Sequence, residues 1–143
     1  MNVESILRNK GRNVITVRPE VKVAAAIALL RRHGIGALVV SKDGGSVDGI
    51  LSERDVVHAL ADYGDQALGR EVAQLMSRRV ITCKPDDTVA DLMALMTERR
   101  IRHLPAVEGG VLTGIISIGD VVKNRLDEVE SEATSMREFI TGA

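Results

Sequence analysis

The sequence predicts an α+β protein in which two copies of one β-α-β-β-α unit pack together with pseudo-two-fold symmetry. Two observations predict this fold. The segment VITVRP at 14–19 recurs as VITCKP at 80–85, and GILSERDVV at 49–57 recurs as GIISIGDVV at 114–122. Both blocks keep their order, and the one-residue difference in their offsets falls in a glycine-rich turn, where length changes are tolerated. The chain therefore contains an internal duplication.

The first unit is expected over residues 14–62. A β-branched strand at 14–17 opens it, and Pro19 and Glu20 are typical of a helix start. The apolar positions of this helix follow i, i+3, i+4, i+7 spacing: Val23, Ala26, Ile27 and Leu30. The remaining elements are a helix stop at Gly34, strands at 37–40 and 47–51, and a last helix from about Ser52.

The second unit is expected over residues 80–125 and repeats the same order. A strand at 80–83 is followed by a helix that begins near Pro85. The apolar face of that helix is Val89, Leu92, Met93 and Met96. Strands at 104–107 and 111–116 and a helix from about Ser117 complete the unit. Residues 63–79 between the units begin with a polar, turn-prone stretch and are interpreted as a connector.

Both ends of the chain lie outside the repeats. Residues 1–13 are a lead-in whose apolar positions (Val3, Ile6 and Leu7) predict a short helix that stops near Gly11. Residues 126–143 are a helical extension. Its apolar stripe has heptad spacing: Val122, Leu126, Val129, Ala133, Met136 and Ile140. The extension either packs on its own domain or meets a second copy, and we predict a homodimer.

The composition excludes several classes of protein. The net charge is −1, and there is one Tyr, one Phe and no Trp, so neither a basic surface nor stacking platforms for nucleic acid are present. Any bound base must lie between aliphatic side chains. Cys83 is the single cysteine, which excludes an intramolecular disulfide and favours a core position. No leader or membrane-length apolar run is visible, so we predict a cytoplasmic protein without a membrane partner.

The repeated pattern Gly-apolar-apolar-Ser-x-x-Asp is the candidate site. It places Ser52 and Asp55, and again Ser117 and Asp120, at the point where a strand passes into a helix. The free N–H groups and positive dipole of a helix start suit a phosphate, and an ionised carboxylate can accept both ribose hydroxyls. The same spacing is also a helix capping box, so spacing alone leaves both interpretations open.

In the order and duplication of these motifs the chain resembles a tandem pair of CBS (cystathionine-β-synthase) domains, often called a Bateman module. The segments that carry the resemblance are 14–19, 80–85, 101–107, 49–55 and 114–120. They span nearly the whole chain, and no catalytic domain is attached, so the resemblance is to the stand-alone members.

The resemblance implies two clefts between the repeats, each able to bind an adenosine-based ligand. The first would combine Ser117, Ile118 and Asp120 with Thr16, Ile35, Gly36 and Ala37. The second would combine Ser52, Arg54 and Asp55 with Thr82, Ile101, Arg102 and His103. Arg102 and His103 would lie centrally, within reach of either cleft.

Of the two clefts, the one at Asp120 is expected to bind better, because Gly36 and Ala37 leave more room than the bulkier side chains opposite Asp55. Gly119 weakens the helix start beside Asp120 slightly. We predict a regulatory module that binds an adenosine-based ligand. AMP is the first choice, and ADP, ATP, NAD(H) and S-adenosylmethionine are alternatives. The bound state would be read by a regulated protein or by the dimer partner. The rival interpretations are a ligand-free structural or dimerisation module and, less favoured, an enzyme acting on nucleotides.

Catalysis has no visible apparatus in the sequence. No nucleophile is paired with a base, and no His, Cys or acidic grouping has metal-ligand spacing. We therefore expect a binding protein that is not an enzyme and that requires neither a metal nor a cofactor.

Overall fold

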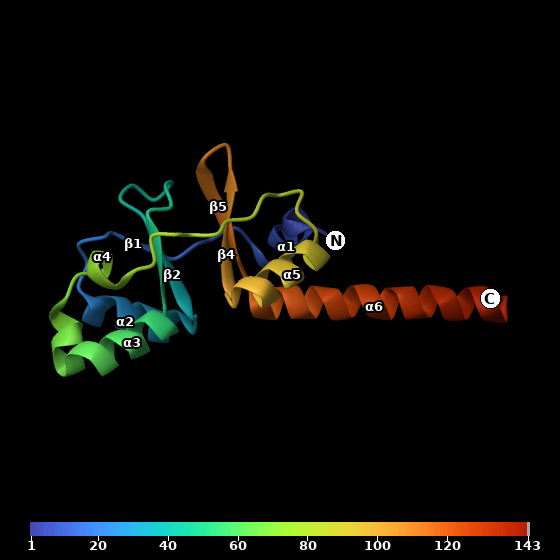
Figure 1. Ribbon diagram of the computed structural model, residues 1–143. Coiled ribbons are helices and arrows are strands. Elements are labelled where there is room, and N and C mark those ends of the chain that lie inside the picture. The colour runs from blue at the N-terminus through green and yellow to red at the C-terminus, as the bar shows by residue number, and fades with distance from the viewer. Residues whose placement is uncertain (143) are drawn as a thin grey trace.

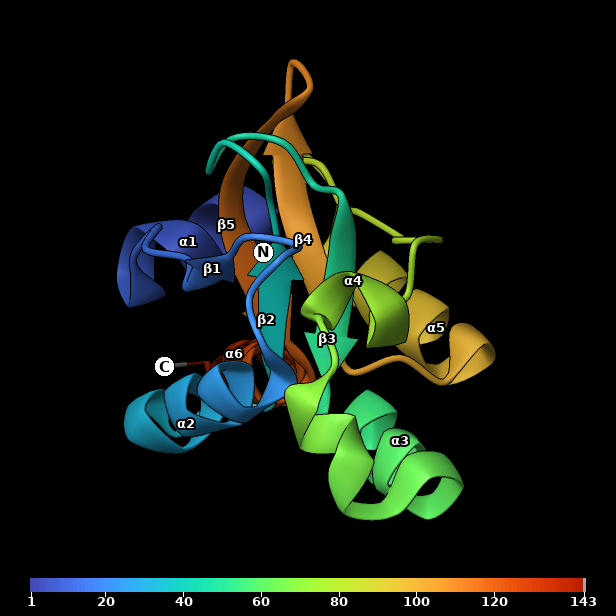
Figure 2. The ribbon, with the colours of Figure 1, turned by 90° about the vertical axis from the view of Figure 1, so that its left-hand side faces the viewer.

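The computed structural model describes residues 1–142 and has two halves, each with a small sheet and covering helices (Figure 1). In the first half, β1 (Thr16–Val17), β2 (Ala37–Val40) and β3 (Gly49–Ser52) form a sheet in that order. β1 is parallel to β2, and β2 is antiparallel to β3. Helices α2 (Val23–His33) and α3 (Glu53–Tyr63) lie along one end of these strands in both views (Figure 2).

The second half repeats this arrangement with one change. β4 (His103–Glu108) and β5 (Val111–Ser117) form an antiparallel hairpin, and α5 (Val89–Arg99) and α6 (Ile118–Thr141) correspond to α2 and α3. The strand predicted at 80–83 is reduced to a single parallel bridge between Cys83 and Ala106. The α+β class and the duplicated unit predicted from the sequence are confirmed.

Both first helices begin later than their prolines suggested, at Val23 and Val89. The residues after each proline form a turn instead, closed by bonds from Val21 N to Arg18 O and from Asp87 N to Lys84 O. The predicted stop at Gly34 is confirmed, with the glycine in the left-handed region at φ 60°. At the matching end of α5, Arg100 takes up the same conformation at φ 54°, which is uncommon for a residue with a side chain.

Three further helices lie outside the predicted units: α1 (Val3–Lys10), the 3-10 helix η1 (Gly64–Gly69) and α4 (Val72–Leu75). The predicted helix at the N-terminus is therefore present and ends at Gly11. The stretch interpreted as a connector is not purely polar, because α4 contributes a fully buried Val72. The residue limits assigned to the repeats stay a prediction.

Helices α1 and α4 lie outside the predicted units, and each completes the core of one half. Val3, Ile6 and Leu7 of α1 belong to the core of the second half, and Val72 and Met76 belong to the core of the first. Figure 1 shows α1, at the start of the chain, beside β5. Matching bridges fix both helices, Asn2 with Thr88 and Glu71 with Lys22. The duplicated pattern thus extends to these segments.

The repeated glycines make room for these helices. A Cβ at Gly114 would lie 2.5 Å from Leu7 Cδ2, and one at Gly49 would lie 2.5 Å from Met76 Sδ. Both glycines are buried on the last strand of their half. Close approach of α1 and α4 to the sheet therefore requires a residue without a side chain at both positions.

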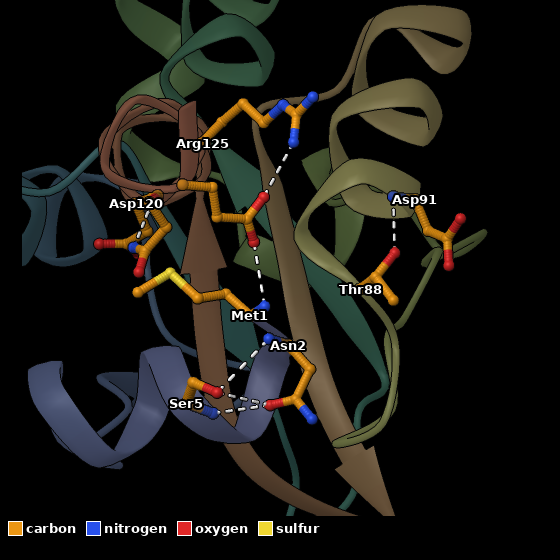
Figure 3. A network of polar contacts seen from close by, with 9 residues as sticks. Met1, Asn2, Ser5, Thr88, Asp91, Asp120 and Arg125 are labelled. Atoms are coloured by element: carbon orange, nitrogen blue, oxygen red, sulfur yellow. Dashed lines mark hydrogen bonds and ion pairs between the residues drawn. The ribbon is translucent and has the colours of Figure 1, made fainter. Parts of the chain in front are cut away.

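α6 continues well past the body of the protein as a single helix (Figure 1). Its first turns pack on α5 and bury Val121, whereas every residue from 129 to 142 is exposed. The N-terminal amino group of Met1 lies 3.0 Å from Glu128 Oε1, and Arg125 pairs with the same carboxylate (Figure 3). The pair with Met1 holds the base of the projecting helix to the start of the chain, while the pair with Arg125 lies within α6.

Candidate functional site

The two Ser-x-x-Asp motifs form complete capping boxes at the starts of α3 and α6. Asp55 Oδ2 accepts from the backbone N of Ser52 at 2.8 Å and from its hydroxyl at 3.0 Å, while Ser52 Oγ accepts from Asp55 N. Asp120 and Ser117 repeat the reciprocal backbone bonds. The capping interpretation of the pattern is therefore confirmed. It does not exclude ligand contact, because no described residue donates a hydrogen bond to Asp55 Oδ1.

A cavity of about 480 Å³ opens in front of the Ser52 and Asp55 cap. Its wall comes from both halves, with aliphatic, cationic and polar parts. The lining residues are Gly36, Ile50, Ser52, Glu53, Arg54, Asp55, Ser77, Arg79, Val80, Ile81, Arg100, Ile101, Arg102 and His103. The cavity is of the size typical of small-molecule sites, which are mostly apolar with a few placed polar groups.

The polar part of this wall is predominantly cationic. Four arginines line the cavity (Arg54, Arg79, Arg100 and Arg102), against the two carboxylates of Glu53 and Asp55. Arg54 also donates to the backbone carbonyl of Arg100 at 3.3 Å, which links α3 to the end of α5. Guanidinium groups bind phosphate in bidentate fashion, so this wall suits an anionic ligand.

His103 lies where the two halves meet. A Cβ on Gly36 would lie 3.2 Å from His103 Cε1 and 2.9 Å from Glu53 Oε1. Burial lowers the pKa of His103, opposed by the nearby carboxylates of Glu53 and Asp120 and assisted by the positive charges of Lys10 and Arg102. The imidazole is therefore held neutral near pH 7, next to groups from both clefts.

The surroundings of Asp120, which the resemblance placed in the first cleft, are arranged differently. Lys10, at the end of α1, donates to Asp120 Oδ2 at 2.6 Å and to the carbonyl of Ile115 at 2.9 Å. Burial by itself would raise the pKa of Asp120, but hydrogen bonds from Lys10 and Ser117 and the charge of Lys10 outweigh it and lower the pKa. The carboxylate assigned to ribose in this cleft is thus already paired within the chain.

The structure brings together most of the residues assigned to the second cleft: Ser52, Arg54, Asp55, Ile101, Arg102 and His103. Gly36, assigned to the other cleft, lines the same cavity, whereas Thr82 is exposed and is not part of the wall. The first backbone N–H of α3 and of α6 donates to the carbonyl just before the neighbouring strand of the same half. Glu53 N donates to Gly36 O before β2, and Ile118 N donates to Arg102 O before β4. This pair of bonds repeats the pseudo-symmetry at the site.

The remaining residues assigned to the first cleft are mostly structural where the chain is described. Ala37 is buried in β2, Thr16 and Ile35 are partly buried, and Ile118 packs on the second core. Sequence reasoning missed Lys10 and also several wall residues: Ile50, Glu53, Ser77, Arg79, Val80, Ile81 and Arg100. Arg100 stands in the second repeat where the first repeat has Gly34. This replacement of a helix-ending glycine by a cation could have marked Arg100 as a candidate site residue.

Two features are absent from residues 1–142, a membrane-spanning helix and a metal-binding cluster. No helix in that range is long and apolar enough to cross a membrane. No group of three or more His, Cys, Asp or Glu side chains within the same residues is arranged to hold a metal ion.

The duplicated helix caps and the cavity shared by the two halves are features of a protein built from two copies of one domain. The family model of the CBS domain matches this chain twice, at residues 3–62 and 72–127. The chain belongs to the CBS-domain family. The CBS pair accounts for both copies of the repeat, and its matched segments include α1 and begin at α4.

Relatives of this CBS pair match most or nearly all of its length. It is 30% identical to the mitochondrial CBS domain-containing protein CBSX3 of Arabidopsis thaliana, over 98% of this chain and 72% of the relative. The crystal structure of the CBS-domain containing protein ATU1752 from Agrobacterium tumefaciens is 46% identical, with a TM-score of 0.84. That likeness covers 87% of this chain and 92% of the other. These likenesses show that the chain has the fold of a CBS-domain pair.

A third likeness is to a CBS pair solved with ligands. The CBS domain pair of protein MJ0100, in complex with 5′-methylthioadenosine and S-adenosyl-L-methionine, is 25% identical with a TM-score of 0.76. It covers 86% of this chain and 98% of the other. Both of its ligands contain an adenosyl group.

Proposed function

We propose that this CBS pair is a regulatory module that binds an adenine nucleotide, with AMP as the first choice. The observation that carries the proposal is the cavity in front of Asp55, which combines an aliphatic wall, a helix start and four arginines. Adenine fits the aliphatic part, ribose the free oxygen of Asp55, and phosphate the arginines. The adenosyl ligands of the MJ0100 pair support the same class of compound.

We place the principal site at Asp55, the reverse of the order expected from the sequence. The side chains opposite Asp55 are bulkier, as expected, but they line a cavity and do not fill it. The carboxylate of Asp120 is instead bound by Lys10. A ligand at Asp120 must first displace that ammonium group, which lowers its apparent affinity.

The phosphate contributes to recognition in this proposal. ADP, ATP and NAD(H) share the adenosine and phosphate of AMP, while S-adenosylmethionine shares only the adenosine and carries a cationic sulfonium. We expect the arginines to favour the phosphorylated ligands over S-adenosylmethionine. Because a nucleotide contacts both halves, its occupancy biases their arrangement, which a regulated protein or a dimer partner can read. Binding is the function proposed here, with no turnover of the nucleotide.

One experiment tests both the site and the ligand class. Isothermal titration compares AMP with 5′-methylthioadenosine, which lacks phosphate, on the wild type and on Asp55→Ala and Asp120→Ala. Asp55→Ala is expected to cost about 1.5–3 kcal/mol of AMP binding, the range for hydrogen bonds to a charged group. Asp120→Ala is expected to cost less.

Asp91→Ala is the matched control, because Asp91 occupies the same N3 position of a helix start but lies outside the cavity wall. Equal losses at Asp55 and Asp120 would contradict the ranking of the clefts. Equal affinity for AMP and 5′-methylthioadenosine would contradict a role for the arginines. No binding of any adenosyl ligand would contradict the whole proposal.

That last result would favour a structural or dimerisation module. The specific observation in favour of this second function is that both serines and both aspartates already satisfy each other as helix caps. A ligand-free module would show no rise in melting temperature with any adenosyl compound, since only a ligand that binds the folded state stabilises it. Chromatographic analysis of nucleotides after incubation with the protein tests the remaining rival, an enzyme.

A further inference from the structure

The projecting part of α6 carries an apolar stripe that covers nothing in the protein's own body. Leu126 is 63% exposed, Met136 63% and Ile140 74%, and Val122 and Val129 are exposed on the same stripe. Successive members are four and three residues apart, so they form one seam along the helix. The alternative in which this helix packs on its own domain is not what the structure shows beyond its first turns.

The charges beside the seam point to one occupant. With Leu126, Ala133 and Ile140 at heptad position a, the g positions hold Arg125, Glu132 and Phe139, and the e positions hold Lys123, Glu130 and Arg137. In a parallel pair of helices, each g residue faces the e residue five positions later in its partner.

That rule joins Arg125 to Glu130 of the second copy and Glu132 to Arg137 of the second copy. Both contacts are between opposite charges, on each side of the seam. The outer f position is not part of this pattern, and Glu138 there faces away from the seam.

We propose that α6 pairs with α6 of a second copy of this chain in a parallel two-stranded coiled coil over residues 122–140. The seam buries the exposed apolar stripe, and the g-to-e pairs set its register and parallel direction. The base of each helix is already held to the body by the ion pair between the Met1 amino group and Glu128. The seam is short, so the dimer is of moderate affinity and dissociates on dilution.

Sedimentation equilibrium of the nucleotide-free protein over a micromolar concentration series tests the pairing. The wild type is expected to pass from monomer to dimer. Arg137→Glu places two acidic residues opposite each other and is expected to weaken the dimer about threefold to tenfold. The double variant Glu132→Arg/Arg137→Glu restores opposite charges and is expected to recover the wild-type affinity. Glu138→Arg is the matched charge reversal on the outer face and should leave the dimer unchanged.

A cysteine at position 129 tests the direction of the helices. In a parallel pair, position d of one helix lies opposite the same residue of the other, so oxidised Val129→Cys should form a disulfide-linked dimer. Cys83 is buried and serves as the wild-type control under the same conditions. A monomer at every concentration, a dimer indifferent to Arg137→Glu, or a dimer without the disulfide at 129 would each overturn the proposal. Because no nucleotide is present, these outcomes are independent of the binding proposal.

Discussion

At the scale of single residues, Asp55 and Asp120 show how one motif acquires two environments. Each closes the capping box of its helix. Asp55 then faces a cavity, whereas Asp120 is bound by Lys10 from the other end of the chain. An exposed lysine bonded to a partly buried carboxylate exchanges with other donors at modest cost, so Lys10 makes the two clefts unequal without closing either permanently.

His103 gives a prediction at this scale. Lys10, Glu53, Arg102 and Asp120 surround it, and burial lowers the pKa of its imidazole. Between the unfolded pKa of about 6.5 and the lower folded value, the unfolded state binds the extra proton. Stability is therefore full above that range and falls as the pH decreases through it. Chemical denaturation between pH 7 and pH 5 should show this loss in the wild type and a flatter profile in His103→Asn.

His58→Asn is the control, because His58 lies exposed on α3. It should keep the pH dependence of the wild type. A wild-type profile in His103→Asn as well would contradict the assignment of the pH dependence to the buried imidazole.

At the scale of secondary-structure elements, the fold depends on α1 and α4, two short helices outside the predicted units that each complete one core. Val3, Ile6 and Leu7 are almost completely buried in the second core, although they lie outside its sequence unit. Val72 is equally buried in the first core. The glycines on β3 and β5 admit these helices, so the repeated glycine of the motif is a packing residue as well as the start of a candidate site.

Gly114→Ala tests this packing. The added methyl group meets three atoms of the buried Leu7 side chain between 2.5 and 3.2 Å. Overpacking of this kind is expected to destabilise the protein by about 1–3 kcal/mol. Urea denaturation followed by circular dichroism measures the change.

Gly119→Ala is the control, because its added methyl group would meet only Ser117 Oγ, at 3.6 Å. Alanine is the better helix former, so this variant should be neutral or stabilised by up to about 1 kcal/mol. If Gly114→Ala proved as stable as Gly119→Ala, close approach of α1 to β5 would not be the reason for the glycine.

At the scale of the whole molecule, each half is completed by a helix that the simple repeat scheme leaves out. The first core needs α4, which follows its last predicted element, and the second needs α1, which precedes the other half. The halves also share the wall of the cavity. We therefore expect the intact chain to unfold in one cooperative step, because the second core contains α1 from the far end of the chain and both halves form the wall of the cavity.

Two fragments test this expectation. Residues 14–62 contain the first predicted unit without α4, and residues 12–79 add α4 with Val72 and Met76. The shorter fragment is expected to be largely unfolded, and the longer to keep a thermal transition by circular dichroism, because only the longer one contains the whole first core. A cooperative transition in fragment 14–62 would contradict the role assigned to α4.

The sequence alone was sufficient for the duplication, for the order of most strands and helices within the two units, for the helix starts at Ser52 and Ser117, and for the stop at Gly34. These features depend on periodicity and capping among residues a few positions apart, which a single sequence records directly. It was also sufficient for part of the Asp55 cavity, because the duplicated motif marked its cap and the family resemblance added residues 101–103, while the rest of the wall was missed.

Only the tertiary structure decided which of the two aspartates faces a cavity and which helices complete which core. Lys10 and Asp120 are separated by 110 positions, and Leu7 and Gly114 by a similar distance, so nothing local to either residue indicates that they meet. The failed prediction of a strand at 80–83 has the same cause. Whether that segment forms a strand depends on its pairing with β4, and only Cys83 pairs there, with Ala106. Contacts of this kind follow from how the two halves pack, and the packing is a property of the folded chain as a whole.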